Sequence, residues 1–134
     1  MPSSIVIAAA AATELQPAPI AAGWILSGTP EARNKMLAAS DDRTAYVMVW
    51  ECTPGLFNWH YDTDETLVII SGEVFITDVN DVERRMGPGD MGFFPAGSSC
   101  KWRVTNRVRK VAVLRTPLPA PLALSLRVWN KLFR

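Results

Sequence analysis

The most informative segment of this chain is Trp59-His60-Tyr61-Asp62-Thr63-Asp64-Glu65-Thr66-Leu67-Val68-Ile69-Ile70-Ser71-Gly72-Glu73. His60 is the single histidine of the protein. Six residues separate the carboxylate of Glu65 from Gly72, and they include the apolar run 67–70. A strand that is apolar on both faces is covered on both sides. We therefore expect a β-strand with the interior of a barrel on one side and another layer, such as a partner subunit, on the other.

Short segments with strand character lie on both sides of this stretch, separated by turns rich in glycine, proline and aspartate. We expect strands at residues 24–28, 45–52, 66–71, 73–78, 82–86, 91–94, 100–106 and 110–114. One helical turn is expected within residues 31–40. Many short strands with such turns predict an all-β fold, an antiparallel β-barrel or jelly roll.

The segment 100–105 shows which side of its strand faces the core. Because side chains alternate along a strand, Cys100, Trp102 and Val104 share one face, and Lys101 lies on the other. We expect the first face to point inward and the second to be exposed.

Glu65 is the strongest candidate for a functional residue. Strand phase places it with Leu67 and Ile69, so its carboxylate is expected to point inward. An inward carboxylate needs a partner or a raised pKa. The cations considered as partners, if one of them reaches inside, are Arg84, Lys101 and Arg103.

Motifs of several other functional classes are absent from the sequence. It contains no GxGxxG, no GxxxxGK[ST], no nucleophile elbow and no strip of basic and aromatic residues. The short basic clusters at 84–85 and 107–110 are expected to be solvated surface.

The composition is that of an ordinary globular domain. The 134 residues are 49% hydrophobic and 20% charged, with a formal net charge of +1, which fits one domain with one core. So small a charge does not attract nucleic acid or an anionic membrane, and no apolar run is long enough to span a bilayer. We expect neither partner and, by default, a cytoplasmic location. Cys52 and Cys100 are expected to be free thiols.

The two ends of the chain differ from its middle. Residues 1–22 are rich in alanine and proline and predict an extended N-terminal arm, before a barrel at residues 23–116. Residues 117–134 predict a proline-marked linker and a tail helix, which is expected to pack on its own barrel or on a neighbour rather than on a membrane. Its apolar residues at helical spacing are Leu122, Leu126, Trp129, Leu132 and Phe133.

Two spacings together resemble the two motifs of the cupin family. Glu65 is followed by Gly72 after six residues, and Gly89 is followed by Pro95 after five residues and then by Gly97. The surrounding sequence is similar to small single-domain cupins related to the cupin domain of ureidoglycine aminohydrolase. The resemblance covers about residues 20–116. It implies an RmlC-like jelly roll, also called a double-stranded β-helix, and it does not cover the first 20 residues or the C-terminal helix.

The resemblance also implies a divalent metal site, from which this chain departs. Cupins hold manganese, iron, nickel or zinc with two histidines two residues apart, a carboxylate and a histidine from a facing strand. Depending on the register, the paired histidine positions are here Asn58 with His60 or Trp59 with Tyr61. Cys100 stands at the remaining histidine position. The candidate metal set is therefore His60, Glu65 and Cys100, with Asn58 or Tyr61 as weak additions. In the second register the set is Glu65, Cys100 and Tyr61, and His60 points outward.

We expect that the protein has no cofactor. The alternative is one divalent transition metal. His60 is then either a partly exposed strand-edge histidine or one that is hydrogen bonded to Asp62 or Asp64. Cys100 is expected to be a buried, inert thiol in preference to a reactive one.

Three functions are compatible with these observations. The first is a small cupin that binds a small polar molecule, such as a carboxylate, a ureide or a sugar-like compound, inside the barrel. Its pocket would be lined by Glu65, Tyr61, Trp59, Cys100 and Trp102. The second is a metal-dependent enzyme similar to ureidoglycine aminohydrolase, acting on a C–N bond. The third, compatible with the first, is a non-catalytic module that forms a homodimer through the arm and the tail helix. Whether the protein is an enzyme stays open.

Overall fold

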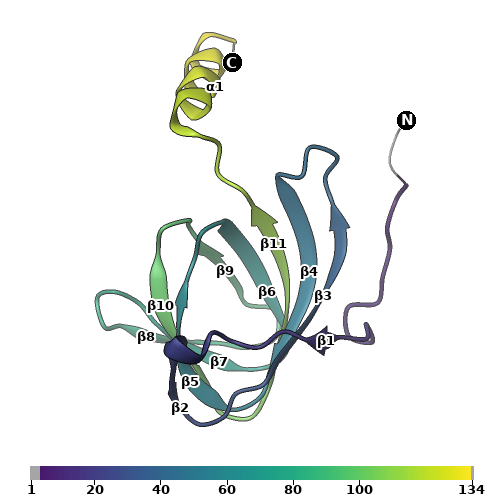
Figure 1. Cartoon of the computed structure of the whole chain (residues 1–134), viewed down its shortest axis with the longest axis vertical. Helices are drawn as coiled ribbons and strands as arrows, with labels where there is room; N and C mark the ends of the chain where they lie inside the picture. Colours follow the sequence, from purple (N-terminus) through teal and green to yellow (C-terminus); the bar gives the residue numbers. More distant parts are fainter. Residues whose placement is uncertain (1–3, 134) are drawn as a thin grey trace.

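The computed structural model describes residues 4–133, which form two facing β-sheets and one C-terminal helix (Figure 1). Residues 1–3 of the predicted arm and residue 134 of the predicted tail lie outside the described residues. The six-stranded sheet has the order β1-β3-β4-β11-β6-β9. Its strands are β1 (Gln16–Pro17), β3 (Ala32–Ala39), β4 (Ala45–Cys52), β11 (Val108–Arg115), β6 (Asp64–Gly72) and β9 (Met91–Phe94).

The five-stranded sheet has the order β2-β5-β10-β7-β8. Its strands are β2 (Ile25–Ser27), β5 (Gly55–His60), β10 (Ser99–Val104), β7 (Val74–Thr77) and β8 (Glu83–Met86). All strand pairs in both sheets are antiparallel. The predicted all-β jelly roll is confirmed.

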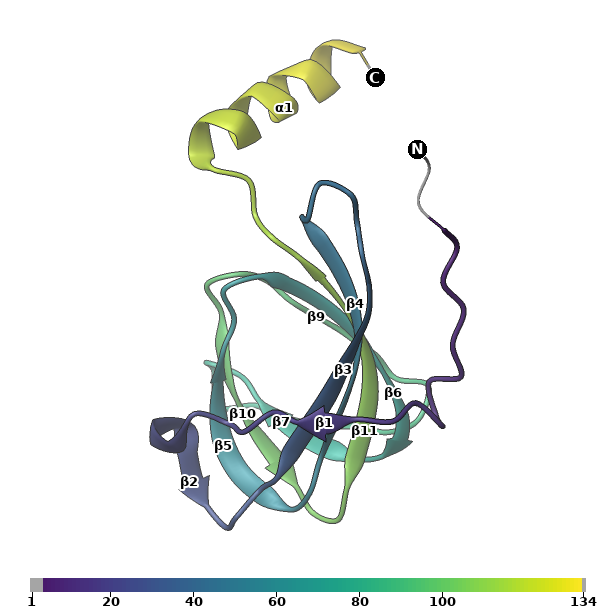
Figure 2. The same cartoon turned by 45° about the vertical axis from the view of Figure 1, so that its right-hand side comes forward.

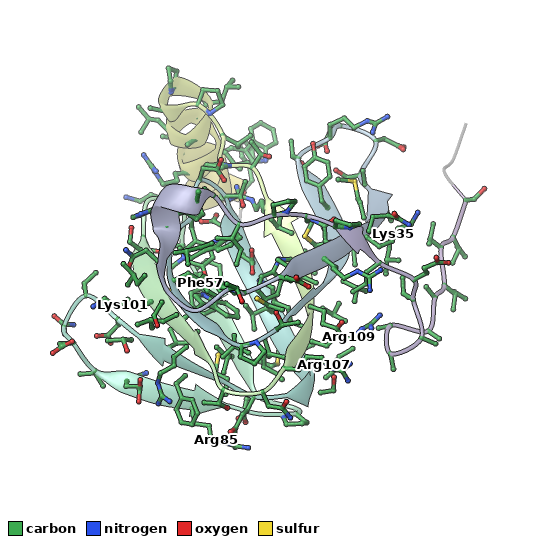
Figure 3. The ribbon with its side chains drawn as sticks, turned by 60° about the horizontal axis from the view of Figure 1, so that its bottom comes forward. Lys35, Phe57, Arg85, Lys101, Arg107 and Arg109 are labelled. Atoms are coloured by element: carbon green, nitrogen blue, oxygen red, sulfur yellow. The ribbon has the colours of Figure 1, made fainter. Side chains whose placement is uncertain are left out.

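The core lies between the two sheets and is filled from their inner faces. On β10, Trp102 and Val104 are buried whereas Lys101 is exposed, as the alternation of this segment predicted. Phe57 of β5, which is fully buried, lies among the strands, and Lys101 lies on the outside (Figure 3). The interior of the barrel is therefore aromatic at the level of β5 and β10.

The apolar run of β6 is covered unequally on its two faces. Leu67 and Ile69 are fully buried in the core, while Val68 and Ile70 on the other face are half-buried. The barrel core covers the inner face of β6, as predicted. The outer face keeps part of its apolar surface accessible within this one chain.

The prediction of a helical turn within residues 31–40 is wrong. This segment forms β3, which pairs with β4 along its length. Exposed Arg33 and Lys35 alternate with buried Ala32 and half-buried Asn34, which is the period of a strand. Tertiary pairing with β4 decides the conformation of a segment whose alanines and lysine also suit a helix.

The N-terminal arm is partly attached to the barrel. Its residues Gln16–Pro17 form β1 and pair with β3, so the sheet begins inside the segment predicted as an arm. Leu15 is buried, and Arg109 of β11 donates hydrogen bonds to the carbonyl oxygens of Ala10 and Thr13. The side chain of Ile5, by contrast, is exposed, and this end of the arm runs away from the strands (Figure 2).

Gly72 at the end of β6 is required by the close approach of another loop. Its φ of +72° is in the left-handed region, and a Cβ at this position would overlap the carbonyl group of Arg107. The glycine that ends the first cupin motif therefore lets two turns of the barrel meet.

The helix α1 (Ala120–Phe133) forms as predicted but does not pack on its own barrel. It has no buried residue, and both views show it apart from the strands (Figures 1 and 2). Of the two expected packing partners, the chain's own barrel is excluded. Within residues 4–133, no helix has the length and apolar character needed to cross a membrane.

Candidate functional site

Glu65 points into the barrel from the start of β6. Its Cα pairs with Phe94 of β9 on one side and with Leu114 of β11 on the other. The residue is 4% exposed, and it shares the inner face with Leu67 and Ile69. The inward position expected for this carboxylate is confirmed.

The partner of Glu65 is Lys110, which the sequence analysis placed on the solvated surface. The Nζ atom of Lys110 lies 2.5 Å from Oε2 of Glu65, and both side chains are almost fully buried. Lys110 lies on the inner face of β11, in phase with buried Ala112. The expected partners are elsewhere: Lys101 is exposed, and Arg103 pairs with a carboxylate on the surface. Arg84, the third, is exposed on β8.

Two tryptophan rings complete the surroundings of the ammonium group. Nζ of Lys110 lies 4.8 Å from the ring centroids of both Trp50 and Trp102. The face of an indole ring carries partial negative charge and attracts a cation. The carboxylate of Glu65 and the two ring faces together stabilise a buried positive charge, which would be costly alone.

A series of side-chain contacts links Trp102 to Cys100 through Tyr61. The indole Nε1 of Trp102 donates a hydrogen bond of 3.0 Å to the hydroxyl oxygen of Tyr61, which lies 3.7 Å from Sγ of Cys100. Burial raises the pKa of the Tyr61 hydroxyl, and burial also raises the pKa of the Cys100 thiol. Cys100 is therefore a neutral thiol at neutral pH and not an activated nucleophile. Both cysteines are free, as expected.

His60 is not part of this group. Strand β5 turns Trp59 inward and His60 outward, where the side chain is exposed and its Nδ1 lies 2.7 Å from Oγ of Ser99. The partner is thus Ser99 and not Asp62 or Asp64. The register found is the second one considered, with Trp59 and Tyr61 at the paired histidine positions. The structure does not bring the set His60, Glu65 and Cys100 together, because alternation along β5 places the imidazole on the face opposite Trp59. The His60 ring contacts Trp24 instead, with 5.0 Å between ring centroids.

The donor atoms inside the barrel do not fit a divalent metal ion. Within residues 4–133 no three histidine, cysteine, aspartate or glutamate side chains gather closely enough to hold one. Glu65 is already bonded to an ammonium group, and Cys100 lines a different groove from Glu65. A tetrahedral or octahedral site needs three or more nitrogen, oxygen or sulfur ligands at about 2.0–2.3 Å, which this arrangement does not supply.

A cavity of about 390 Å³ opens above the Glu65–Lys110 pair. Its walls include three tryptophans, and the ring centroids of Trp24 and Trp59 are 5.1 Å apart at an interplanar angle of 74°. The lining residues are Ala18, Pro19, Trp24, Asn34, Met48, Trp50, Trp59, His60, Tyr61, Asp62, Thr63, Glu65, Lys110 and Leu114. The cavity therefore combines flat apolar walls with an ion pair.

The cavity contains only part of the pocket predicted from the sequence. Glu65, Tyr61 and Trp59 line it. Trp102 is 1% exposed and lies beneath the ammonium group. Cys100 lines a different groove, of about 650 Å³, which also touches β8 and β9.

Sequence reasoning missed Lys110, Trp24 and Asn34 as residues of the cavity, whereas Trp50 was considered both as a core residue and as a possible pocket wall. A signal for Lys110 exists, since it alternates in phase with Val108 and Ala112, both of which are fully buried. Trp24 is the last residue of a 3₁₀ turn, Ala22–Trp24, that precedes β2, so strand alternation gives no direction for its side chain.

Comparison with known proteins identifies the fold and a family. A family model described as the EutQ-like cupin domain matches residues 39–112. No curated protein matches. A protein of unknown function from Pseudomonas syringae pv. tomato has a similar structure, with a TM-score of 0.71 and 27% identity, covering 77% of this chain and 45% of that one.

Two solved structures named EutQ are also similar. The Clostridium difficile EutQ protein has a TM-score of 0.58 and 20% identity, over 65% of this chain and 64% of that one. The Salmonella typhimurium protein, described as a putative ethanolamine utilization protein, has a TM-score of 0.57 and 16% identity, over 77% and 98%. Identities this low show the fold alone. The matched region is less than half of the Pseudomonas protein and less than two thirds of the Clostridium protein.

Proposed function

The chain belongs to the family of EutQ-like cupin domains, and we propose that it binds a small, uncharged polar molecule inside its barrel. One observation carries this proposal: a buried ion pair, Glu65 with Lys110, lies at the base of a cavity with tryptophan walls. The cavity volume of about 390 Å³ falls in the range of about 300–1,000 Å³ that is usual for small-molecule sites.

The ion pair offers both a hydrogen-bond donor and an acceptor to such a molecule. Glu65 accepts a hydrogen bond from Lys110 at Oε2, and both residues line the cavity. The second oxygen of the carboxylate, Oε1, is the acceptor that the proposal assigns to the ligand. Lys110 has three N–H groups and gives one of them to Glu65. A ligand with a carbonyl or hydroxyl oxygen next to an N–H or O–H group would complement both.

The same pair disfavours charged ligands. A carboxylate bound to Lys110 would lie beside the carboxylate of Glu65, and an ammonium bound to Glu65 would lie beside that of Lys110. Like charges at such separations in a poorly solvated site repel strongly. Of the classes compatible with the sequence, amide-like, ureide-like and sugar-like compounds are thus favoured over carboxylates.

The walls of the cavity suit flat or ring-shaped molecules. Trp24 and Trp59, and Trp59 and Trp50, meet edge to face at 5.1 and 5.9 Å between centroids. Indole faces stack on planar amides and on the C–H faces of sugars, and they exclude water from the polar contacts.

Titration with a panel of small molecules tests this proposal. Tryptophan fluorescence is recorded while acetamide, N-methylurea, glycerol or a small cyclic sugar is added. Acetate and ethanolamine serve as charged probes, the latter because the Salmonella relative is described by ethanolamine utilization. We expect saturable changes with one or more uncharged compounds and none with the charged probes.

A matched pair of variants assigns the binding to the cavity. Glu65→Gln removes the buried carboxylate, and Glu83→Gln makes the same change at a surface carboxylate that pairs with Arg103. Affinity is expected to fall at least about tenfold, worth 1.4 kcal/mol, in Glu65→Gln and to stay unchanged in Glu83→Gln. Equal affinity in both variants, or no saturable binding by any compound, would refute the proposal.

A dimeric assembly is a second candidate function that is compatible with the first. The exposed apolar residues Leu122, Trp129 and Phe133 of α1 support it, since a helix apolar over so much of its surface is usually covered. Light scattering of the full chain is expected to give twice the mass of one chain, and Trp129→Glu/Phe133→Glu is expected to return it to one. A monomeric full chain would exclude this assembly.

A further inference from the structure

We propose that Lys110 supplies, from within the chain, the positive charge that a divalent metal ion supplies in metal-binding cupins. Its ammonium group holds Glu65 and presents N–H donors to an oxygen atom of the ligand. The ligand contact rests on the proposed function, whereas the replacement of the metal by Lys110 does not.

The position of Lys110 is the first argument. Glu65 stands at the carboxylate position of the first cupin motif, and Nζ of Lys110 is 2.5 Å from its Oε2. A metal ion bound by this carboxylate would lie at about 2.0–2.2 Å from the oxygen. The two cations would therefore compete for one place, and mutual repulsion in this buried site prevents both from being present.

The residues around the ammonium group are the second argument. Trp59 and Tyr61 occupy the paired histidine positions, and the faces of Trp50 and Trp102 lie 4.8 Å from Nζ. An indole face attracts an ammonium ion but has no lone pair in that direction to bind a divalent metal. The aromatic replacements thus suit the cation that the chain itself provides.

The burial of the pair is the third argument. The side chains of Lys110 and Glu65 are 4% and 5% exposed. A buried carboxylate without a counter-ion is costly, so this barrel needs a cation next to Glu65. Lys110 meets that need in every molecule, at any concentration of metal.

The metal content of the wild-type protein is the first test. The full chain is produced in medium containing manganese, iron, nickel and zinc, and it is purified without an affinity tag or a chelator. We expect less than about a tenth of an equivalent of any transition metal, and no shift of the melting temperature with added metal or with a chelator. About one equivalent of bound metal would overturn the inference.

Chemical rescue of Lys110→Ala is the second test. The truncation leaves a space beside Glu65 that fits a small alkylammonium ion such as n-propylammonium. We expect this salt at millimolar concentration to raise the melting temperature of Lys110→Ala by several degrees and to leave the wild type unchanged. Sodium chloride at equal ionic strength is the salt control.

The double variant Lys110→Ala/Glu65→Gln identifies the group that binds the added ion. Without the carboxylate, n-propylammonium is expected to have no effect. An equal effect in the single and double variants, or no effect in a folded Lys110→Ala, would overturn the inference. If Lys110→Ala does not fold, the metal content of the wild type still decides it. A metal-free wild type that binds none of the small uncharged molecules would refute the proposed function and leave the role of Lys110 intact.

Discussion

The interior of the barrel and the helix α1 are both rich in large apolar residues, but they differ in how those residues are used. Trp102 in the barrel is 1% exposed, contacts an ammonium group and donates a hydrogen bond to Tyr61. Trp129 in α1 is 60% exposed and contacts only Phe133 of the same helix among the aromatic residues of 4–133. The barrel core is complete within one chain, whereas the apolar surface of α1 is not.

Polar contacts in the core therefore contribute more to stability than polar contacts on the surface. Burial makes each polar contact of Glu65, Lys110 and Tyr61 costly to break, because the remaining partner cannot turn to water. On α1 and on the outer surface, solvent replaces lost contacts at little cost. Substitutions of similar chemistry are therefore expected to have very different effects in the two regions.

Breaking the buried ion pair is expected to have the largest effect. Lys110→Met leaves the carboxylate of Glu65 buried without a counter-ion, which costs about 3–5 kcal/mol of the free energy of unfolding. The measurement is urea unfolding followed by circular dichroism. The double variant Lys110→Met/Glu65→Leu is the control and is expected to recover part of the loss. A single variant within about 1 kcal/mol of the wild type would contradict the importance of the pair.

Removing the Tyr61 hydroxyl is expected to have an intermediate effect. Tyr61→Phe leaves the indole N–H of Trp102 without its acceptor in the core, at a cost of about 1–3 kcal/mol. Tyr46→Phe is the matched control, because the Tyr46 hydroxyl donates to a carbonyl oxygen at an exposed turn. Equal unfolding free energies for the two variants would show that the buried hydrogen bond adds nothing.

Raising the pH is expected to weaken the barrel gradually. Burial raises the pKa of the Cys52 thiol from 9.0 to about 12. The folded state therefore holds this proton more tightly than the unfolded chain, and the resulting stability is complete below pH 9 and is lost as the pH rises toward 12. Urea midpoints measured between pH 8 and 11 should fall in the wild type. Cys52→Ala should show a shallower fall, and identical slopes would exclude this contribution of Cys52.

Substitution in α1 is expected to have the smallest effect on the barrel. Trp129→Ala should change the unfolding free energy of the barrel by at most about 0.5 kcal/mol, because Trp129 is 60% exposed and α1 has no buried residue. The comparison is Trp102→Ala, expected to cost about 3–5 kcal/mol. Both variants are measured at a protein concentration at which the chain is monomeric, where a loss of more than about 1 kcal/mol in Trp129→Ala would show that α1 packs on its own barrel.

The sequence predicts the fold of this molecule better than its candidate functional site. The spacing of Glu65 and Gly72, taken with the second cupin motif, predicts the cupin fold. Strand alternation predicts that the side chain of Glu65 points inward. Strand alternation could not decide between the two registers considered for His60. The chain has no second histidine two residues away that would mark which positions face inward. Lys110 was misplaced because its neighbours Arg107 and Arg109 are basic and a charged run is usually solvated. The helical turn expected within 31–40 failed because pairing with β4 outweighs local propensity.

Crystallographic soaking tests whether the cavity at Glu65 and Lys110 binds small uncharged molecules. Crystals of the full chain are soaked with a library of small uncharged polar compounds. We predict bound molecules in the cavity of about 390 Å³, with an oxygen atom on Nζ of Lys110 and a donor on Oε1 of Glu65. Bound molecules found only in the groove of about 650 Å³ that is lined in part by β8 and β9, or none at all, would contradict the account.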